Sequence, residues 1–233
     1  MKARHPSPRQ LPLDLAHGEA RSRDDLIVTP ANEQAVTLVE SWPDWPAPVV
    51  VLAGPAGSGK SHLADIWRTE SGAFSVPAAQ TDADALAAAE HRPILVDDTD
   101  DPHLDETGLF HLINTVRSSG THLLLTARRF PAGWGVSLPD LLSRLKAAAT
   151  VEIQEPDDML LSGVIVKLFA DRQVGVEPHV VQFIVRRMER SLSTAQMLVE
   201  HLDKAALERQ ARVTRGLASE ILSALEEGRE HPI

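Results

Sequence analysis

The chain has 233 residues, 43% hydrophobic and 24% charged, and a formal net charge of −10 at pH 7. This length allows one medium-sized domain and a small one, and the lack of Cys excludes disulfides and thiolate chemistry and favours the cytoplasm. No apolar stretch approaches the length of a membrane span or of a signal core, and the acidic balance argues against strong sequence-independent DNA binding, although a local basic face stays open.

Residues 1–23 differ from the rest of the chain, because they are basic and proline-containing at the start and are expected to form a disordered tail. The tail contains the hexapeptide Gln10-Leu11-Pro12-Leu13-Asp14-Leu15, whose leucines alternate and fall on one side of an extended chain. This spacing is typical of a linear peptide that docks into an apolar pocket of a partner. A short edge strand, or a tail folded back on its own domain, fits the same spacing.

The next segment of the chain is an entry to the first domain. Leu26, Ile27 and Val28 are expected to be extended, and a helix is predicted over 32–41. Prolines and tryptophans at 42–48 end that helix, and the tryptophans are expected to pack inside the protein.

A short apolar run at residues 49–53 leads directly into Gly54-x-x-x-x-Gly59-Lys60-Ser61, the phosphate-loop pattern. Its glycines let successive N–H groups point at phosphate oxygens, and the helix that follows adds its positive end. Lys60 would supply a charge for the β- and γ-phosphates, and the Ser61 hydroxyl can join a Mg²⁺ shell. The alternative is a strand-to-helix turn that is merely rich in glycine. The predicted nucleotide-binding residues here are Gly54, Pro55, Ala56, Gly57, Ser58, Gly59, Lys60 and Ser61.

Polar side chains end two further predicted strands. The strand at 94–96 closes on Asp97, which would bind Mg²⁺, and Asp98, which could polarise a water for attack on the γ-phosphate. The strand at 122–126 ends in Thr126, whose hydroxyl can hold the attacking water or sense the γ-phosphate, or can simply bind backbone. The acids that come next are expected to form a solvated turn: Asp100 and Asp101.

A short helix beginning near Ser137 carries Arg144 on the side opposite its leucine stripe, so this guanidinium is expected to project outward. From its place after the fourth strand it could reach the nucleotide of a neighbouring subunit, and a solvated charge is the alternative. The other predicted elements of this part are helices over 82–91 and 105–119 and strands at 73–76 and 150–153.

From Glu155-Pro156 onward the pattern is helical throughout, with helices predicted over 157–171, 178–190, 194–210 and 215–227. The predicted fold is therefore α/β: a tail at 1–23, a five-stranded parallel-sheet domain at 24–155, and a small all-helical lid at 156–233. The His residues show no spacing that suggests a metal site.

This arrangement resembles the AAA+ family, and within it the Hda family of DnaA-related regulators of replication initiation. The segments that carry the resemblance are Gln10–Leu15, Ala31–Glu33, Gly54–Leu63, Val96–Asp98, Leu124–Arg128 and Leu138–Leu145. It implies that His62 joins the nucleotide-binding residues and that Leu26 and Val28, with Asn32, line the adenine pocket. The bound nucleotide would be ADP or ATP with Mg²⁺.

The same resemblance implies two partners. The hexapeptide is similar to the motif that binds the DNA sliding clamp, the β subunit of DNA polymerase III, with Gln10 on the polar side of the pocket and Leu11, Leu13 and Leu15 as anchors. Arg144 matches the arginine finger that would reach the nucleotide of DnaA, drive its hydrolysis, and so restrain initiation. A trans arginine of this kind can change a rate by ~10³–10⁵.

Three departures from the family are visible. The position of the lid sensor arginine is Ser193, with Arg190 as a speculative substitute, and Ala127-Arg128-Arg129 stands where the family often has Asp-Arg. The chain also ends after the lid, with no room for the DNA-binding domain of DnaA. Two other functions stay open: a self-contained, at most weak ATPase acting in cis, and a DNA-binding initiator or loader. The oligomeric state, including self-association, is not determined by the sequence.

Overall fold

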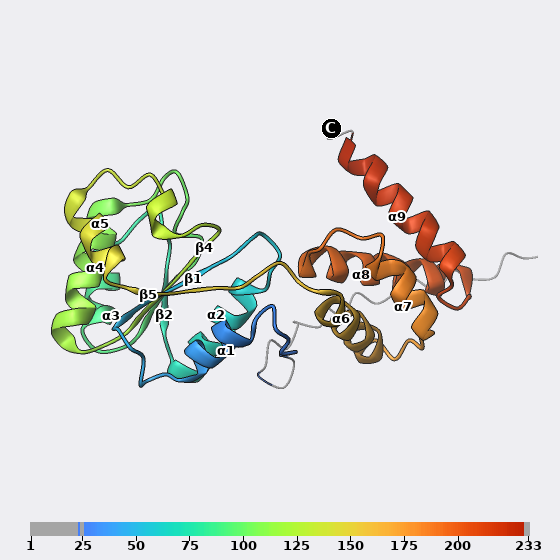
Figure 1. The fold of residues 1–233 in the computed structure, drawn as a ribbon, viewed down its shortest axis with the longest axis horizontal. Coiled ribbons are helices and arrows are strands. Elements are labelled where there is room, and N and C mark those ends of the chain that lie inside the picture. Colours follow the sequence, from blue (N-terminus) through green and yellow to red (C-terminus); the bar gives the residue numbers. More distant parts are fainter. Residues whose placement is uncertain (1–22, 24–25, 231–233) are drawn as a thin grey trace, which may run out of the picture.

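The computed structural model describes Arg23 and residues 26–230, and it has an α/β part followed by a helical part (Figure 1). Five parallel strands form one sheet in the order β2-β3-β4-β1-β5, which confirms the predicted five-stranded α/β fold. The strands are β1 (Val49–Ala53), β2 (Phe74–Val76), β3 (Ile94–Val96), β4 (Leu123–Ala127) and β5 (Ala149–Glu152).

The central strand is β1, which pairs with β4 on one side and β5 on the other. All its residues are buried, as are those of β3 and β4, because helices cover both faces of the sheet. Since the strands are parallel, the ends of β1, β3 and β4 meet at one edge. The phosphate loop follows β1 at that edge.

Helices lie on both faces of the sheet (Figure 1). One apolar cluster joins the sheet to the first pair of helices and a second cluster joins it to the next three. The first pair is α1 (Glu33–Glu40) and α2 (Lys60–Ser71), and the others are α3 (Ala83–Ala89), α4 (Glu106–Ser119) and α5 (Pro139–Lys146). A short 3-10 turn, η2 (Pro131–Gly133), precedes α5.

The tryptophans near the start of the domain pack inside it, as the sequence predicts. Trp45 stacks on Trp67 with ring centroids 5.1 Å apart, and Trp42 meets the edge of Trp67 at 6.4 Å. The His122 ring lies against both Trp42 and Trp45, and burial there lowers its pKa below the ordinary value. This aromatic cluster closes the end of the sheet where the strands begin.

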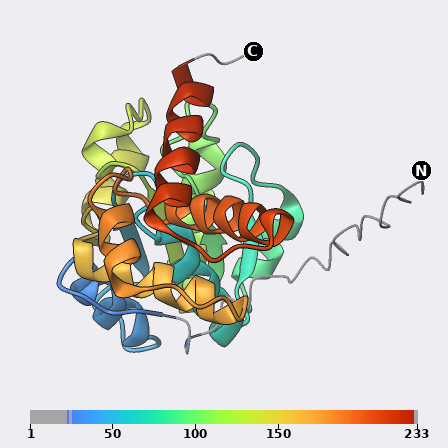
Figure 2. The ribbon, with the colours of Figure 1, turned by 90° about the vertical axis from the view of Figure 1, so that its right-hand side faces the viewer.

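The helical part has a core of its own, and it faces the viewer in Figure 2. Its helices are α6 (Asp158–Asp171), α7 (Pro178–Val185), α8 (Leu192–Arg209) and α9 (Arg215–Glu230). Side chains cap three of them, because Asp157 accepts from the Leu160 N–H, Ser191 from the Thr194 N–H and Thr214 from the Leu217 N–H. No helix in the described residues has the length and apolarity to cross a bilayer.

The predicted helix over 178–190 is wrong at its end, since α7 stops at Val185. The chain must become extended at Ser191, with φ −146° and ψ 131°, so that this residue can cap α8. The residues between the two helices therefore form a turn, and they bring the start of α8 to the phosphate loop.

Candidate nucleotide-binding site

The loop between β1 and α2 has the backbone that phosphate binding requires. Gly54, Gly57 and Gly59 have φ values of +156°, +70° and +100°, which L side chains rarely adopt. A Cβ at Gly54 would also lie 2.3 Å from the Ile153 carbonyl oxygen. The glycines therefore allow a tight turn in front of α2, whose twelve residues direct the positive end of the helix at the loop.

Lys60 begins α2 and is 6% exposed. Its ammonium group donates to the Pro55 carbonyl oxygen at 2.8 Å, across the loop. Burial lowers the pKa of Lys60, while the negative charges of Asp98 and Asp97 act in the opposite direction. A phosphate placed in the loop would favour the charged form and would replace the carbonyl as partner of the ammonium.

Three predicted site residues meet at the ends of β3 and β4. The Thr126 hydroxyl donates to Asp97 Oδ1 and accepts from the Asp98 N–H at 3.0 Å, and Ser61 Oγ donates to the same Asp97 oxygen at 3.3 Å. Thr126 is fully buried and Asp98 is exposed with φ +52°. Thr126 therefore orients Asp97 within the protein. A hydroxyl beside a carboxylate fits Mg²⁺, which takes few protein ligands and keeps several waters.

The acids after Asp98 include a structural residue that sequence reasoning missed. The side chain of Asp100 is only 6% exposed, so the expected solvated turn is wrong for this position. Its carboxylate accepts from the Arg128 N–H at 3.0 Å and from Arg129 Nε at 3.4 Å. Asp100 thereby fixes the loop that follows β4. The carboxylate of Asp101 is exposed, and its pKa is lowered by hydrogen bonds from His103.

The start of α8 lies directly on the phosphate loop. The Leu192 N–H donates to the Gly57 carbonyl oxygen at 2.7 Å, and a Cβ at Gly57 would lie 2.1 Å from Ser191 Oγ. Ser193 Oγ is 3.1 Å from the same position and hydrogen-bonds Ser191 Oγ. Ser193 therefore lies beside the phosphate loop. Two helix N-termini, those of α2 and α8, therefore meet at this loop.

One polar atom of the loop lacks a partner inside the described protein. Ser58 is 2% exposed, and its hydroxyl has no hydrogen bond to another described residue. An unsatisfied buried hydroxyl is costly, so a ligand oxygen in the loop would stabilise it. This observation, together with the glycine backbone, fits the phosphates of a nucleotide.

The segment predicted to line an adenine pocket lies between the two parts of the chain. Ile27 contacts α6, since a Cβ at Gly163 would lie 3.0 Å from its Cδ1 atom. Val28 is 43% exposed and Leu26 is half-buried. Asn32 is buried and holds the segment in place: its amide donates to the Ile27 carbonyl oxygen and accepts from the backbone N–H of residue 29.

Arg190 makes its described contacts at the hinge between the two parts. Its guanidinium donates to the Pro156 carbonyl oxygen at 3.0 Å and to Asp158 at 2.6 Å. It therefore ties the turn before α8 to the start of α6, and none of these contacts is with the phosphate loop. His62 follows Ser61 in the first turn of α2 and is half-buried.

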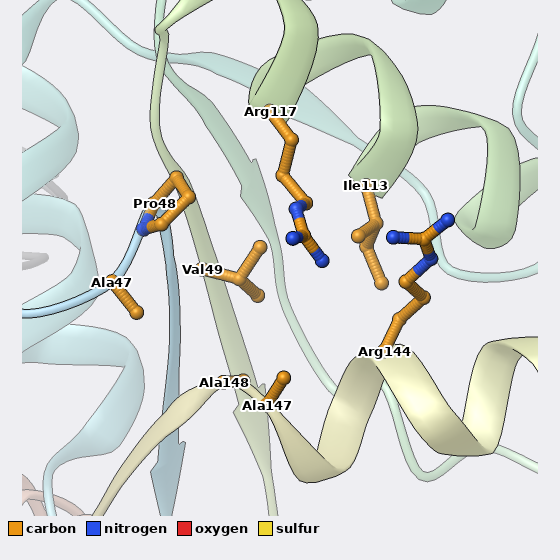
Figure 3. Close-up of a pocket in the computed structure, with 8 residues that line it drawn as sticks. All are labelled: Ala47, Pro48, Val49, Ile113, Arg117, Arg144, Ala147 and Ala148. Carbon is orange, nitrogen blue, oxygen red and sulfur yellow. The ribbon is translucent and has the colours of Figure 1, made fainter.

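Arg144 lies at the other end of the sheet. It lines a pocket of about 100 Å³ together with Ala47, Pro48 and Val49, the residues where β1 begins (Figure 3). The helical spacing predicts that this side chain projects outward into solvent. In the structure it does not project freely. It is half-buried, and its guanidinium lies 6.0 Å from the centroid of the Phe110 ring of α4. Figure 3 shows the guanidinium of Arg117 pointing into the same pocket.

The predicted clamp-binding residues Gln10, Leu11, Leu13 and Leu15 lie outside the described residues. Within the described part, no group of three or more His, Asp or Glu residues is arranged to hold a metal ion. A magnesium ion at Ser61 and Asp97 would therefore take its remaining ligands from the nucleotide and water.

Comparison with known proteins gives the fold. No protein-family model matches the chain. A Haemophilus influenzae protein described as uncharacterized is 27% identical over 193 residues, which is 77% of this chain and 84% of that protein. Domain III of the replication initiation protein DnaA from Thermotoga maritima superposes with a TM-score of 0.74 over 88% of this chain and 96% of that one, at 16% identity.

Two other solved structures are similar. The RuvB Holliday junction branch migration motor of Thermotoga maritima has a TM-score of 0.69 at 19% identity, over 88% of this chain and 72% of that one. AMPPCP-bound DnaA from Aquifex aeolicus has a TM-score of 0.66 at 17% identity, over 80% and 68%. The chain therefore has the AAA+ fold that DnaA and RuvB share.

Proposed function

We propose that the chain binds an adenine nucleotide, ADP or ATP, with Mg²⁺, between the phosphate loop and the lid formed by α6–α9. The glycine backbone, the unsatisfied Ser58 hydroxyl and the start of α8 on Gly57 support this placement. The similar DnaA structure from Aquifex aeolicus carries AMPPCP, which is consistent with an adenine nucleotide.

The roles of the residues follow from their positions. Backbone N–H groups of Gly54–Ser61 would hold the phosphates, Lys60 would neutralise the β- and γ-phosphates, and Ser61 and Asp97 would hold Mg²⁺. The ion supplies charge neutralisation on the phosphate oxygens. Leu26 and Val28, beside α6, would flank the adenine, and His62 would lie next to the phosphates.

We further propose that Arg144 acts on the nucleotide of another protein, and its position in the fold is the observation that carries this proposal. Arg144 lines a pocket with the residues that begin β1, whereas its own phosphate loop follows the end of that strand. Five residues of strand span roughly 15 Å, so this guanidinium is too far away to serve its own nucleotide. A half-buried cation that lines a pocket at this end of the domain suits the charge that develops on a neighbour's phosphate.

The partner we propose is DnaA, with the chain acting as an Hda-like adaptor. The hexapeptide Gln10–Leu15 would dock on the sliding clamp, with Gln10 on the polar side and the three leucines as apolar anchors. Arg144 would then stimulate ATP hydrolysis on DnaA and inactivate the initiator. The support is the sequence resemblance and the shared fold. If the neighbour is a second copy of this chain, the same geometry gives self-association.

The test is ATP hydrolysis by DnaA, measured with this protein and with or without DNA-loaded clamp. We expect Arg144→Ala to remove the stimulation while clamp binding is retained. Lys146→Ala is the matched control, because it removes a positive charge from the same helix but not from the pocket. Unchanged stimulation by Arg144→Ala would rule out this residue as the finger.

The clamp contact is tested separately. Deleting residues 10–15 is expected to abolish clamp binding in a pull-down and to leave ADP affinity unchanged. Survival of clamp binding in the deletion variant would remove the anchor from the proposal.

A second candidate function is a self-contained ATPase, which the convergence of Ser61, Asp97 and Thr126 favours. Asp98, exposed beside them, would polarise the attacking water. The discriminating measurement is ATP turnover by the purified chain alone. Turnover that is lost in Lys60→Ala supports this candidate, and no turnover above background excludes it.

A further inference from the structure

Three arginines gather on the lid, two in the turn directly after α7 and one at the start of α9. They are Arg186, Arg187 and Arg215, which we call the lid arginine cluster. The cluster lines a hollow of about 300 Å³ together with His179, Gln182 and Phe183. Every one of the six residues except Phe183 is exposed. The hollow is therefore an open, basic concavity on an otherwise acidic chain with a net charge of −10.

The cluster makes no ion pair with the acidic residues that the structure describes. No acidic residue lines the hollow, and none of the described ion pairs involves the three arginines. This differs from Arg209 in the same lid, whose guanidinium donates to Glu220 at 2.8 Å. Like charges that gather without an anion repel one another, so the arrangement favours a negatively charged ligand.

Phe183 holds two of these arginines in place. The guanidinium carbons of Arg187 and Arg215 each lie 4.8 Å from the centroid of its ring, and the ring packs on the lid core. A cation–π contact orients a planar guanidinium and lowers the entropy that it loses on binding. Among the described residues, Phe183 is the one apolar residue that lines the hollow, and both arginines lie against its ring, so the hollow offers little apolar surface to a peptide.

We propose that the lid arginine cluster is a contact site for the phosphate backbone of nucleic acid. Planar guanidinium groups bind phosphate oxygens in a bidentate manner, and three of them on one concave surface suit successive phosphates of a strand. Protein partners are usually bound through buried apolar anchors, which this hollow lacks. The site lies on α7, the turn after it and the start of α9, so it is separate from the phosphate loop and from the pocket of Arg144.

Three phosphate contacts give binding that is weak and sensitive to salt. The logarithm of the affinity is expected to fall with the logarithm of the salt concentration with a slope of roughly −0.9 × 3, or about −2.7. A fourfold increase in salt would then weaken binding by about 40-fold. Such a contact suits a protein that another interaction already holds near DNA.

The experiment is fluorescence anisotropy of a labelled 30-base-pair duplex with the full chain, titrated at several salt concentrations. Each single Arg→Ala change in the cluster is expected to reduce the steepness of the salt slope by about one unit, and the triple variant to reduce it by about three. Arg209→Ala, which removes the same charge from outside the hollow, should leave the slope unchanged. The charges of residues 1–25 are common to all variants and cancel in this comparison.

Phe183→Leu separates positioning from charge. It keeps an apolar side chain against the lid core and all three arginines, so the affinity should fall while the salt slope is kept. The proposal would be overturned by no binding to the duplex at low salt, or by binding whose salt slope is the same in the triple variant and in wild type. Equal affinity of the cluster for polyglutamate would also overturn it, because the site would then recognise acidic chains and not phosphates.

Discussion

The contact between Gly57 and the start of α8 gives the sharpest test of how the lid meets the nucleotide site. In Gly57→Ala the new Cβ would lie 2.1 Å from Ser191 Oγ and 2.8 Å from Ser191 Cβ. Real Cβ atoms do not approach other atoms so closely, so the start of α8 must move away from the loop. The hydrogen bond from Leu192 to Gly57 would be lost with that movement.

Gly120→Ala is the matched control for backbone strain. Gly120 ends α4 with φ +72°, almost the φ +70° of Gly57, but a Cβ there meets no atom within 4 Å. Both substitutions place an L residue in a left-handed conformation, at a cost of roughly 1 kcal/mol in the free energy of unfolding. Any difference between the variants in nucleotide affinity therefore reports the contact with Ser191.

The expected magnitude follows from the contacts that are lost. A hydrogen bond and the packing beside it contribute roughly 1–2 kcal/mol, which corresponds to a 5–30-fold increase in the Kd for ADP in Gly57→Ala. Gly120→Ala should bind ADP like wild type. Isothermal titration calorimetry measures the Kd, and thermal unfolding measures the shared loss of stability.

A second substitution tests whether the contact with Ser191 causes the loss of ADP affinity. Ser191→Gly removes both atoms of the clash, and glycine replaces serine at a helix N-cap at a cost of only a few tenths of a kcal/mol. The double variant Gly57→Ala, Ser191→Gly should therefore recover most of the affinity. If it does not recover, or if Gly57→Ala and Gly120→Ala bind ADP equally well, the lid does not act on the nucleotide through this contact.

Three further predictions concern the titratable and polar groups. Thr126→Val removes the hydroxyl that orients Asp97, so we expect a loss of roughly 1–3 kcal/mol in the free energy of unfolding. We also expect weaker Mg²⁺-dependent binding of ADP, measured by calorimetry. A Mg²⁺ dependence equal to that of wild type would contradict this role of Thr126. Because burial lowers the pKa of His122, the unfolded state binds more protons below the ordinary value of 6.5, and stability should decrease as the pH falls through and below that value. Urea unfolding of His122→Asn should show a flatter pH dependence, and an unchanged curve would locate the effect elsewhere. Burial also lowers the pKa of Lys60, and bound phosphates would raise it. ADP binding should therefore take up protons, and it should weaken as the pH rises through the lowered pKa. Calorimetry in buffers of different ionisation enthalpy measures the proton uptake, and the absence of uptake at alkaline pH would be inconsistent with a Lys60–phosphate contact.

The local elements could be predicted from the sequence because their signals are local. The apolar run at 49–53 and the glycine pattern after it define β1, the loop and the start of α2 within a few residues. The pairing of β1 with β4 and β5 is not visible in this way, since it joins residues far apart in the chain. The strand order that brings Asp97 and Thr126 together came only from the structure.

The features that sequence reasoning missed all depend on contacts between distant segments. Asp100 reads as part of an exposed acidic run, but the loop after β4 buries its side chain. Arg144 is half-buried and lies near Phe110, which is on another helix. Ser191 is a good N-cap residue, and this local signal could have been used to predict an earlier end for α7 and the start of α8.

The length of α8 has a mechanical consequence. Its eighteen residues extend for about 27 Å, from the phosphate loop to the pair of Arg209 and Glu220 that joins it to α9. A rotation of about 10° at the loop would displace the far end by roughly 5 Å. A small movement of the start of α8 at the phosphate loop therefore becomes a larger displacement at its far end. Such a movement can change the distant surface of the lid without altering the sheet.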